Sequence, residues 1–162
     1  MVVEVDGPPC PCGNRGCLEA VASGLAIASQ ARQAVEGGAH TILRQMAQGD
    51  LQTIDAAVVA RAARQGDALA SGIYRRAGEH LGVAIAGVIN LFDPGVVILE
   101  GGLTKAGELL LGPLVRSARD HALPSLSERL RIEVSPLGDD ASALGASALV
   151  LRQLFETPLL GD

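Results

Sequence analysis

The chain has 162 residues, of which 48% are hydrophobic, 19% are charged and only 2% are aromatic, and its net charge at pH 7 is −5. A chain of this length and composition folds around one substantial core and is not disordered. The acidic balance argues against a surface that follows nucleic-acid phosphates, and the scarcity of aromatic rings argues against base stacking. The N-terminus lacks a basic segment followed by an apolar one, and polar residues interrupt the most apolar window, 81–99, so neither a secretory signal nor a membrane partner is expected.

The first twenty residues differ in composition from the rest of the chain. Residues 2–5 predict a short strand, and a turn rich in cysteine and glycine follows, with Cys10, Cys12 and Cys17. An odd, crowded set of cysteines argues against a disulfide framework and favours a metal or thiol site in a reducing cytosol. Three thiolates on one turn are suitable ligands for Zn²⁺, which prefers four sulfur or imidazole ligands. The three histidines are distant in sequence, so three free cysteines or a redox pair remain open alternatives.

The middle of the chain has a helical pattern. An alanine-rich run predicts a helix over 18–35, which ends at a pair of glycines. Thr53 is expected to cap a helix that runs to residue 64, and Asp67 to cap the next helix, over 68–91. The second half of that helix is apolar nearly all round, so we expect neighbours to bury it on two sides.

The last third of the chain alternates between strand and helix patterns. Four consecutive aliphatic residues, 96–99, predict a strand buried on both faces, and residues 131–135 predict a more peripheral strand. Helices are expected over 106–121 and 141–155. This alternation predicts an α/β fold in which helices cover a mostly parallel sheet.

Residues 10–19 read Cys-Pro-Cys-Gly-Asn-Arg-Gly-Cys-Leu-Glu and resemble the signature Cys-x-Cys-Gly-x-x-Gly-Cys-x-Glu of the ROK family (repressors, open reading frames and sugar kinases). The resemblance continues in the family's order through nearly the whole chain. The further matching segments are Ala22-Ser23-Gly24, Gly66-Asp67, Leu81-Gly82, Asn90-Leu91-Phe92-Asp93-Pro94, Gly101-Gly102, Leu137-Gly138-Asp139-Asp140-Ala141 and Leu144-Gly145-Ala146.

This resemblance implies the C-terminal half of an actin-like, ribonuclease H-like ATPase-type fold, with a mixed sheet and flanking helices. It divides the chain into a zinc-knot segment (1–20), a helical part (21–92) and an α/β part (93–162). The N-terminal half of a ROK protein carries an Asp-x-Gly phosphate turn and the base that activates the sugar hydroxyl in the kinases. Family spacing also places the histidine that is the fourth zinc ligand immediately before Met1, so we expect a longer parent protein.

The family pattern assigns roles to several residues. Cys10, Cys12 and Cys17 match the zinc ligands, and zinc in ROK proteins holds an imidazole so that its other nitrogen points at a sugar hydroxyl. Glu19 matches a sugar-binding glutamate, although an acid in the first turn of a helix also has a purely electrostatic explanation.

Gly101 and Gly102 match a glycine turn that lies against the adenine nucleotide in the kinases, where ATP and Mg²⁺ are the cofactors. A tight turn that needs positive φ is an equally good explanation for these glycines. Glu100 stands where the family usually has a third glycine, and a carboxylate there would repel phosphates.

Three functions from different classes are compatible with the sequence. The first is the sugar-sensing and oligomerisation part of a cytoplasmic ROK transcriptional regulator that forms homo-oligomers and reaches DNA only through an N-terminal domain outside this chain. The alternative is the C-terminal half of a ROK sugar kinase, of the glucokinase or N-acetylhexosamine kinase type. A zinc-stabilised structural module is the third. The altered glycine turn favours the regulator, and segment 148–155 resembles the regulators more than the kinases. The chain alone is expected to catalyse no reaction because the phosphate turn and the base lie outside it.

Overall fold

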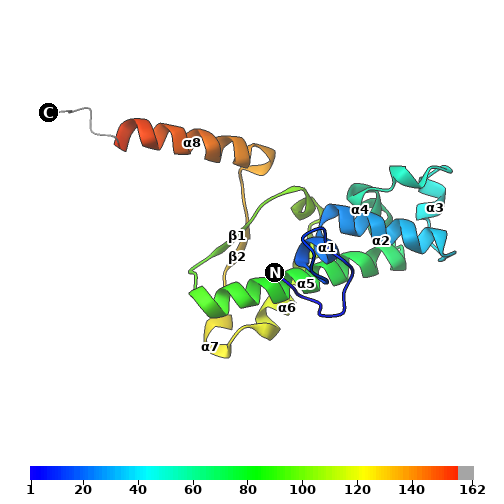
Figure 1. Cartoon of the computed structure of the whole chain (residues 1–162), viewed down its shortest axis with the longest axis horizontal. Helices are drawn as coiled ribbons and strands as arrows, with labels where there is room; N and C mark the ends of the chain where they lie inside the picture. Colours follow the sequence, from blue (N-terminus) through cyan, green and yellow to red (C-terminus); the bar gives the residue numbers. More distant parts are fainter. Residues whose placement is uncertain (157–162) are drawn as a thin grey trace.

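One long helix, α5, is the central element of the fold, and α1, α2, α4 and α6 pack along its length (Figure 1). The computed structural model describes residues 1–156. The α-helices are α1 (Leu18–Ala22), α2 (Gly24–Glu36), α3 (Leu43–Met46), α4 (Ala56–Arg64), α5 (Ala68–Phe92), α6 (Glu108–His121), α7 (Pro124–Ser127) and α8 (Ala141–Glu156). The strands are β1 (Val97–Leu99) and β2 (Ile132–Val134), and the 3-10 turns are η1 (Leu51–Thr53), η2 (Gly102–Ala106) and η3 (Gly138–Asp140).

The main core lies where α1, α2 and α4 meet the first half of α5. Its largest fully buried side chains include Ile27, Leu43, Ile73 and Tyr74. Asp67 caps α5 as predicted, because its carboxylate accepts a hydrogen bond from the amide of Ala70 at 2.8 Å. The helices α1–α5 therefore form one packed unit, which supports the segments before and after it.

The second half of α5 packs against α6 through two glycines. A methyl group on Gly78 would lie 2.6 Å from the Leu110 carbonyl oxygen, and one on Gly82 would lie 2.5 Å from Cβ of Ser117. The prediction that neighbours bury this half on two sides holds only in part. Besides α6, residues of β1 and α7 pack on Ile85 and Ile89, but Leu91 at the end of the helix is 78% exposed. The absence of side chains at the glycines lets the two helix backbones approach closely.

The predicted strand over residues 2–5 does not form. Residues 1–17 fold back as a loop with two isolated antiparallel bridges, Val2 with Cys17 and Pro9 with Arg15. The amides of Val3 and Glu4 both donate to the carbonyl of Gly16, at 2.9 and 3.2 Å, which leaves no regular ladder. Within this loop Val3 packs on the main core, whereas Val2 and Val5 are exposed.

Two of the predicted helices differ from the structure, one in its continuity and one in its cap. The helix expected over 18–35 is interrupted at Ser23, whose backbone is extended and whose hydroxyl accepts from the amide of Ala26 at 3.1 Å, so α2 has its own cap. The cap of α4 is Asp55 and not Thr53, since the Asp55 carboxylate accepts from the amide of Val58 at 2.7 Å. Thr53 ends the 3-10 turn η1 instead.

The sheet within the described residues consists of β1 and β2, which run parallel with Val97 opposite Ile132 and Leu99 opposite Val134. The predicted parallel pairing is confirmed. The prediction that 96–99 is buried on both faces is wrong, because Ile98 is 62% exposed. Val97 packs on the second small core, beneath the end of α5, while the opposite face of the strand has no cover within the described residues.

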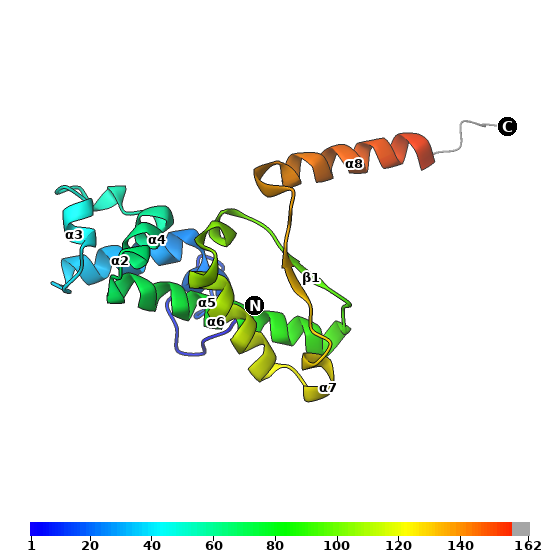
Figure 2. The ribbon, with the colours of Figure 1, turned by 180° about the vertical axis from the view of Figure 1, so that it is seen from behind.

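The end of the described chain projects from the body. Figures 1 and 2 show α8 separated from the other helices and joined to them through β2 and η3. Its bounds, Ala141–Glu156, agree closely with the predicted helix over 141–155, and α6 begins at Glu108 after η2, two residues later than predicted. None of the helices that the structure describes combines the length and apolar character that a membrane span needs.

Candidate metal centre and ligand cleft

The structure brings the three cysteines together. The Sγ atoms of Cys10, Cys12 and Cys17 all lie within 4.8 Å of one another, and those of Cys12 and Cys17 are 3.5 Å apart. Tetrahedral zinc with Zn–S bonds of about 2.3 Å separates its sulfur ligands by about 3.8 Å. The thiol cluster therefore has the size and the chemistry that fit a zinc ion, with small adjustments of the side chains.

Gly16 makes the turn that carries the three cysteines possible. Its φ is +61°, and a Cβ at this position would lie 1.5 Å from the carbonyl oxygen of Glu4. Its amide donates to the carbonyl of Pro8 at 2.8 Å, while the amide of Cys10 donates to the carbonyl of Asn14 at 2.9 Å. The backbone is thus closed around the sulfurs by hydrogen bonds that only a glycine at position 16 permits.

The pKa values of two of the thiols, Cys12 and Cys17, shift in opposite directions. The hydrogen bond from the Asn14 backbone, together with those from the neighbouring thiols, lowers the pKa of Cys12 to about 7. The hydrogen bond with Cys12, together with burial, raises the pKa of Cys17 to about 11. Cys12, which is exposed, therefore supplies a thiolate near neutral pH, which is the form that binds metals.

In the described part of the chain, no histidine or carboxylate joins the three sulfurs. His80 lies instead on α5, with its Nε2 at 3.6 Å from a carboxylate oxygen of Glu4. His121 ends α6, where its Nδ1 contacts the Ser117 carbonyl oxygen at 2.8 Å. These contacts agree with the expectation that the histidines of this chain do not complete the cluster.

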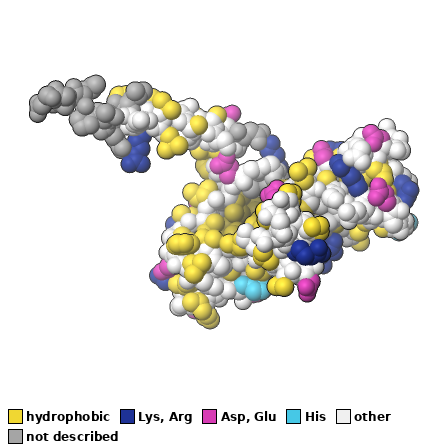
Figure 3. Space-filling model, viewed as in Figure 1, with side chains coloured by type: hydrophobic (Ala, Val, Ile, Leu, Met, Phe, Trp, Pro, Cys, Tyr) yellow, Lys and Arg dark blue, Asp and Glu magenta, His cyan; other side chains and the backbone are white. Residues whose placement is uncertain are grey.

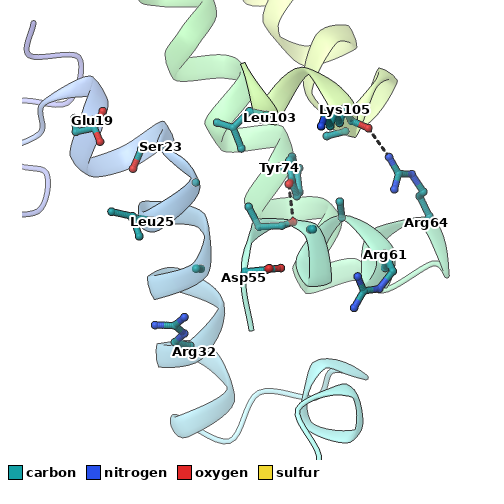
Figure 4. Close-up of a pocket in the computed structure, with 17 residues that line it drawn as sticks. Glu19, Ser23, Leu25, Arg32, Asp55, Arg61, Arg64, Tyr74, Leu103 and Lys105 are labelled. Atoms are coloured by element: carbon teal, nitrogen blue, oxygen red, sulfur yellow. Dashed lines mark hydrogen bonds between the residues drawn. The ribbon is translucent and has the colours of Figure 1, made fainter. Parts of the chain in front are cut away.

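Glu19 lies in the first turn of α1, two residues after Cys17, and faces a large cleft (Figure 4). The cleft has a volume of about 770 Å³ and is formed by α1, α2, α4, α5 and η2. Small residues, several of them alanines from α2 and α4, form much of its wall. The lining residues are Glu19, Ser23, Gly24, Leu25, Ala28, Arg32, Asp55, Ala56, Ala57, Ala60, Arg61, Arg64, Tyr74, Gly102, Leu103, Lys105 and Ala106.

Hydrogen bonds to backbone oxygens fix the far wall of the cleft, as the dashed lines in Figure 4 show. The Tyr74 hydroxyl donates to the carbonyl of Ala56 at 2.7 Å, and burial raises the pKa of Tyr74 to about 12. The Arg64 guanidinium donates to the carbonyl of Lys105 at 2.8 Å and ties α4 to η2. Tyr74 therefore remains a neutral structural donor, and the wall is preformed.

The glycine turn follows β1 and borders the same cleft. Gly102 lines it together with Glu19, while Gly101 lines a small adjoining cavity with Glu100. Gly101 has φ +110°, so the structural explanation for this glycine holds. A carboxylate oxygen of Glu100 accepts a hydrogen bond from the Ser142 hydroxyl at 3.2 Å, which holds the acid between the turn and α8.

The charged residues on the α4 side of the cleft were not predicted from the sequence. Arg61 and Arg64 lie three residues apart on α4, and Asp55 both caps that helix and lines the cleft. The spacing of the arginines places them on neighbouring positions of one helix face. No feature of the sequence alone indicated that this face meets η2.

Known proteins resemble this chain in sequence over most of its length. The family model of the ROK family matches residues 1–153. Glucokinase of Thermotoga maritima is 40% identical over 154 residues, which are 95% of this chain and 48% of that protein. The DNA-binding transcriptional dual regulator NagC of Escherichia coli K12 is 36% identical over 160 residues, 98% of this chain and 37% of the regulator.

A solved structure has the same fold. The ROK family glucokinase from Streptomyces griseus, in complex with glucose and AMPPNP, superposes with a TM-score of 0.77 and 31% identity, covering 92% of this chain and 49% of that one. This chain thus spans half or less of the length of these relatives. Its α/β architecture corresponds to part of the actin-like fold of ROK sugar kinases, and relatives of both kinds, kinases and regulators, match it. Because the ROK family model matches residues 1–153 and a ROK family glucokinase has the same fold, the chain belongs to the ROK family.

Proposed function

We propose that this chain is the sugar-binding and oligomerisation part of a ROK-family transcriptional regulator, with Glu19 as a ligand of the sugar hydroxyls. The observation that carries the choice of regulator is Glu100, whose carboxylate lies next to the glycine turn that borders the cleft. Contact with DNA would come from a domain outside this chain, as the net charge of −5 is unfavourable for a surface that follows nucleic-acid phosphates.

The position of Glu100 opposes nucleotide binding on electrostatic grounds. A polyphosphate at the Gly101–Gly102 turn would meet a carboxylate that Ser142 holds in place, and like charges at close range repel each other. The charge of Glu100 does not oppose sugar binding at Glu19, because Glu19 belongs to a different element, α1. The two ends of the cleft therefore differ in the ligand chemistry that they accept.

We expect the wild-type chain to bind no adenine nucleotide at millimolar concentration, and Glu100→Gly to bind it at least about tenfold more tightly, since one repulsion is removed. Isothermal titration with AMPPNP and Mg²⁺ measures this difference. Glu108→Gly is the matched control, because Glu108 is exposed at the start of α6 and does not line the cleft. Tight nucleotide binding by the wild-type chain would contradict the regulator and favour the kinase.

The second candidate is the C-terminal half of a ROK sugar kinase, with ATP and Mg²⁺ as cofactors. The size of the cleft favours it, since Glu19 and Gly102 share a space of about 770 Å³, several times the volume of one hexose. Glucose and AMPPNP occupy the similar glucokinase of Streptomyces griseus together. In that case Gly101 and Gly102 would contact the nucleotide.

We also propose that Cys10, Cys12 and Cys17 bind one structural Zn²⁺. Three thiolates supply a soft donor set of the size that zinc needs, and their mutual distances require little rearrangement. When bound, zinc would fix the turn that leads into α1, and with it the position of Glu19. A fourth ligand would come from outside the described residues or from solvent.

Cobalt provides a direct test of this metal site. Titration of the reduced chain with Co²⁺ is expected to give thiolate-to-metal absorption at one ion per chain, with zinc displacing cobalt. Cys12→Ser should weaken binding at least about tenfold, because only two sulfurs remain. Asn14→Ala, which changes the same turn but keeps all three sulfurs, should retain the band. Equal metal affinity in Cys12→Ser and the wild type would refute the site.

A further inference from the structure

The sulfur atoms of Cys12 and Cys17 are in contact, 3.5 Å apart. Both residues are free thiols in this structure, and the third thiol, Cys10, lies within 4.8 Å of each of them. A disulfide holds its sulfurs at about 2.05 Å, so the two atoms need to approach by only about 1.5 Å to be joined. The turn therefore already holds one pair of sulfurs near the distance at which oxidation joins them.

The two sulfurs differ in their access to solvent. Cys12 is exposed in this chain, whereas Cys17 is only 6% exposed. A backbone bridge to Val2 holds Cys17, and its carbonyl accepts a hydrogen bond from the amide of Ala20 at 2.9 Å. Figures 1 and 3, which view the molecule from the same side, show the loop over residues 1–17 on the near surface of the body. A dissolved oxidant therefore reaches Cys12 first, and Cys17 lies behind it as the thiol that completes the bond.

We propose that Cys12 and Cys17 are a redox-modification site, at which hydrogen peroxide converts the two thiols into one disulfide. The Cys12 sulfur attacks a peroxide oxygen, so that an S–O bond forms, the O–O bond breaks and the thiol proton leaves in a molecule of water. The Cys17 sulfur then attacks the sulfenic acid, so that the S–S bond forms, the S–O bond breaks and a second molecule of water takes up the Cys17 proton. The two thiols together lose two electrons and two protons, and hydrogen peroxide is reduced to water.

This disulfide and a bound metal exclude each other. Both sulfurs belong to the proposed zinc site, and a sulfur in a disulfide is no longer the thiolate that a metal binds. Oxidation would replace the metal with a covalent cross-link in the turn that leads into α1, beside the cleft that Glu19 lines. Only this exclusion rests on the proposed zinc site. The disulfide itself follows from the positions of the two sulfurs and is tested in metal-free protein.

Peptide mapping of the full chain tests the disulfide. The reduced, metal-free chain is treated with an equimolar amount of hydrogen peroxide, the remaining thiols are alkylated, and the chain is digested with trypsin. Trypsin cuts after Arg15 and so separates Cys12 from Cys17. The expected product is peptide 1–15 joined to peptide 16–32 by a bond that dithiothreitol breaks. Fully alkylated thiols, or a disulfide between Cys10 and Cys12 within peptide 1–15, would overturn the inference.

Serine variants identify the partner of Cys17. Cys10→Ser should form the joined peptides at the wild-type rate, because both members of the pair remain. Cys12→Ser should form them at least about tenfold more slowly, because the exposed thiol that contacts Cys17 is removed. Helical circular dichroism verifies that both variants fold. Equal rates in the two variants, or a slower rate in Cys10→Ser, would contradict the pairing.

Zinc tests the exclusion separately. Loading the chain with Zn²⁺ before peroxide is added should slow the cross-link at least about tenfold, because metal-bound thiolates are protected. The cross-linked chain should give no cobalt absorption until dithiothreitol restores the thiols. An unchanged rate in a chain that binds cobalt would refute the exclusion. A chain that binds no cobalt when reduced would refute the zinc site, whereas the peptide map alone decides on the disulfide.

Discussion

Gly82→Ala is expected to destabilise the fold by about 3 kcal/mol or more. The added Cβ would lie 2.5 Å from Cβ of Ser117 and 2.6 Å from the Leu114 carbonyl oxygen, both on α6. Two packed helix backbones must separate to admit it. The separation would also stretch the hydrogen bond from the Ser117 hydroxyl to the Glu79 carbonyl, which is 2.8 Å long.

Gly72→Ala and Gly87→Ala are matched controls within the same helix. A Cβ at Gly72 would meet only the flexible end of Arg76 at 4.0 Å, and one at Gly87 would meet nothing within 4 Å. Both should stabilise the chain by about 0.5–1 kcal/mol, since alanine favours a helix over glycine. Urea unfolding followed by helical circular dichroism compares the three variants, and equal stability of all three would refute the close approach of α5 and α6.

Asp67→Ala is expected to cost about 3 kcal/mol, more than the loss of an ordinary helix cap. One carboxylate oxygen accepts from the amide of Ala70, and the other accepts from the Thr41 hydroxyl and the Ile42 amide, each at 2.8 Å. The side chain thus caps α5 and also anchors the loop before α3. Asp55→Ala removes a cap with one such bond, to Val58, and should cost only about 1 kcal/mol.

The same carboxylate predicts a dependence of stability on pH. Burial alone would raise the pKa of Asp67, but the hydrogen bonds from Ala70, Ile42 and Thr41 outweigh burial and lower this pKa in the folded chain. A lowered folded-state pKa stabilises the protein above the unfolded value of about 4 and ceases to do so as the pH falls through the folded value. The stability gap between wild type and Asp67→Ala should therefore be full at pH 7 and narrow at pH 3. A gap that stays constant would show that Asp67 acts through neutral contacts.

The sequence was sufficient to predict features that depend on local chemistry. The three cysteines in a glycine turn, the Asp67 cap of α5 and the parallel strands near 97–99 and 132–134 all follow from residue types at short spacing. Glu19 and Gly102, placed through the family pattern, line one cleft.

The features that the sequence did not predict depend on contacts between distant segments. Ser23 interrupts the helix over 18–35 because its hydroxyl caps α2, a role that a serine inside an alanine-rich run does not reveal. The burial of 96–99 was overestimated because a run of aliphatic residues shows what a strand can bury but not what covers it. The wall formed by Arg64 and η2 joins residues forty-one positions apart, which no local pattern encodes.

The central claim, that Glu19 makes this chain a sugar-binding module, is tested most directly by calorimetric titration with glucose and with N-acetylglucosamine. We expect one site per chain for at least one of these sugars, and at least about tenfold weaker binding for Glu19→Gln, because the neutral amide loses a charged hydrogen bond to the sugar. Glu36→Gln, at the exposed end of α2 and outside the cleft, should bind as the wild type does. Sugar affinity that is equal in Glu19→Gln and the wild type, or a wild-type chain that binds neither sugar, would contradict it.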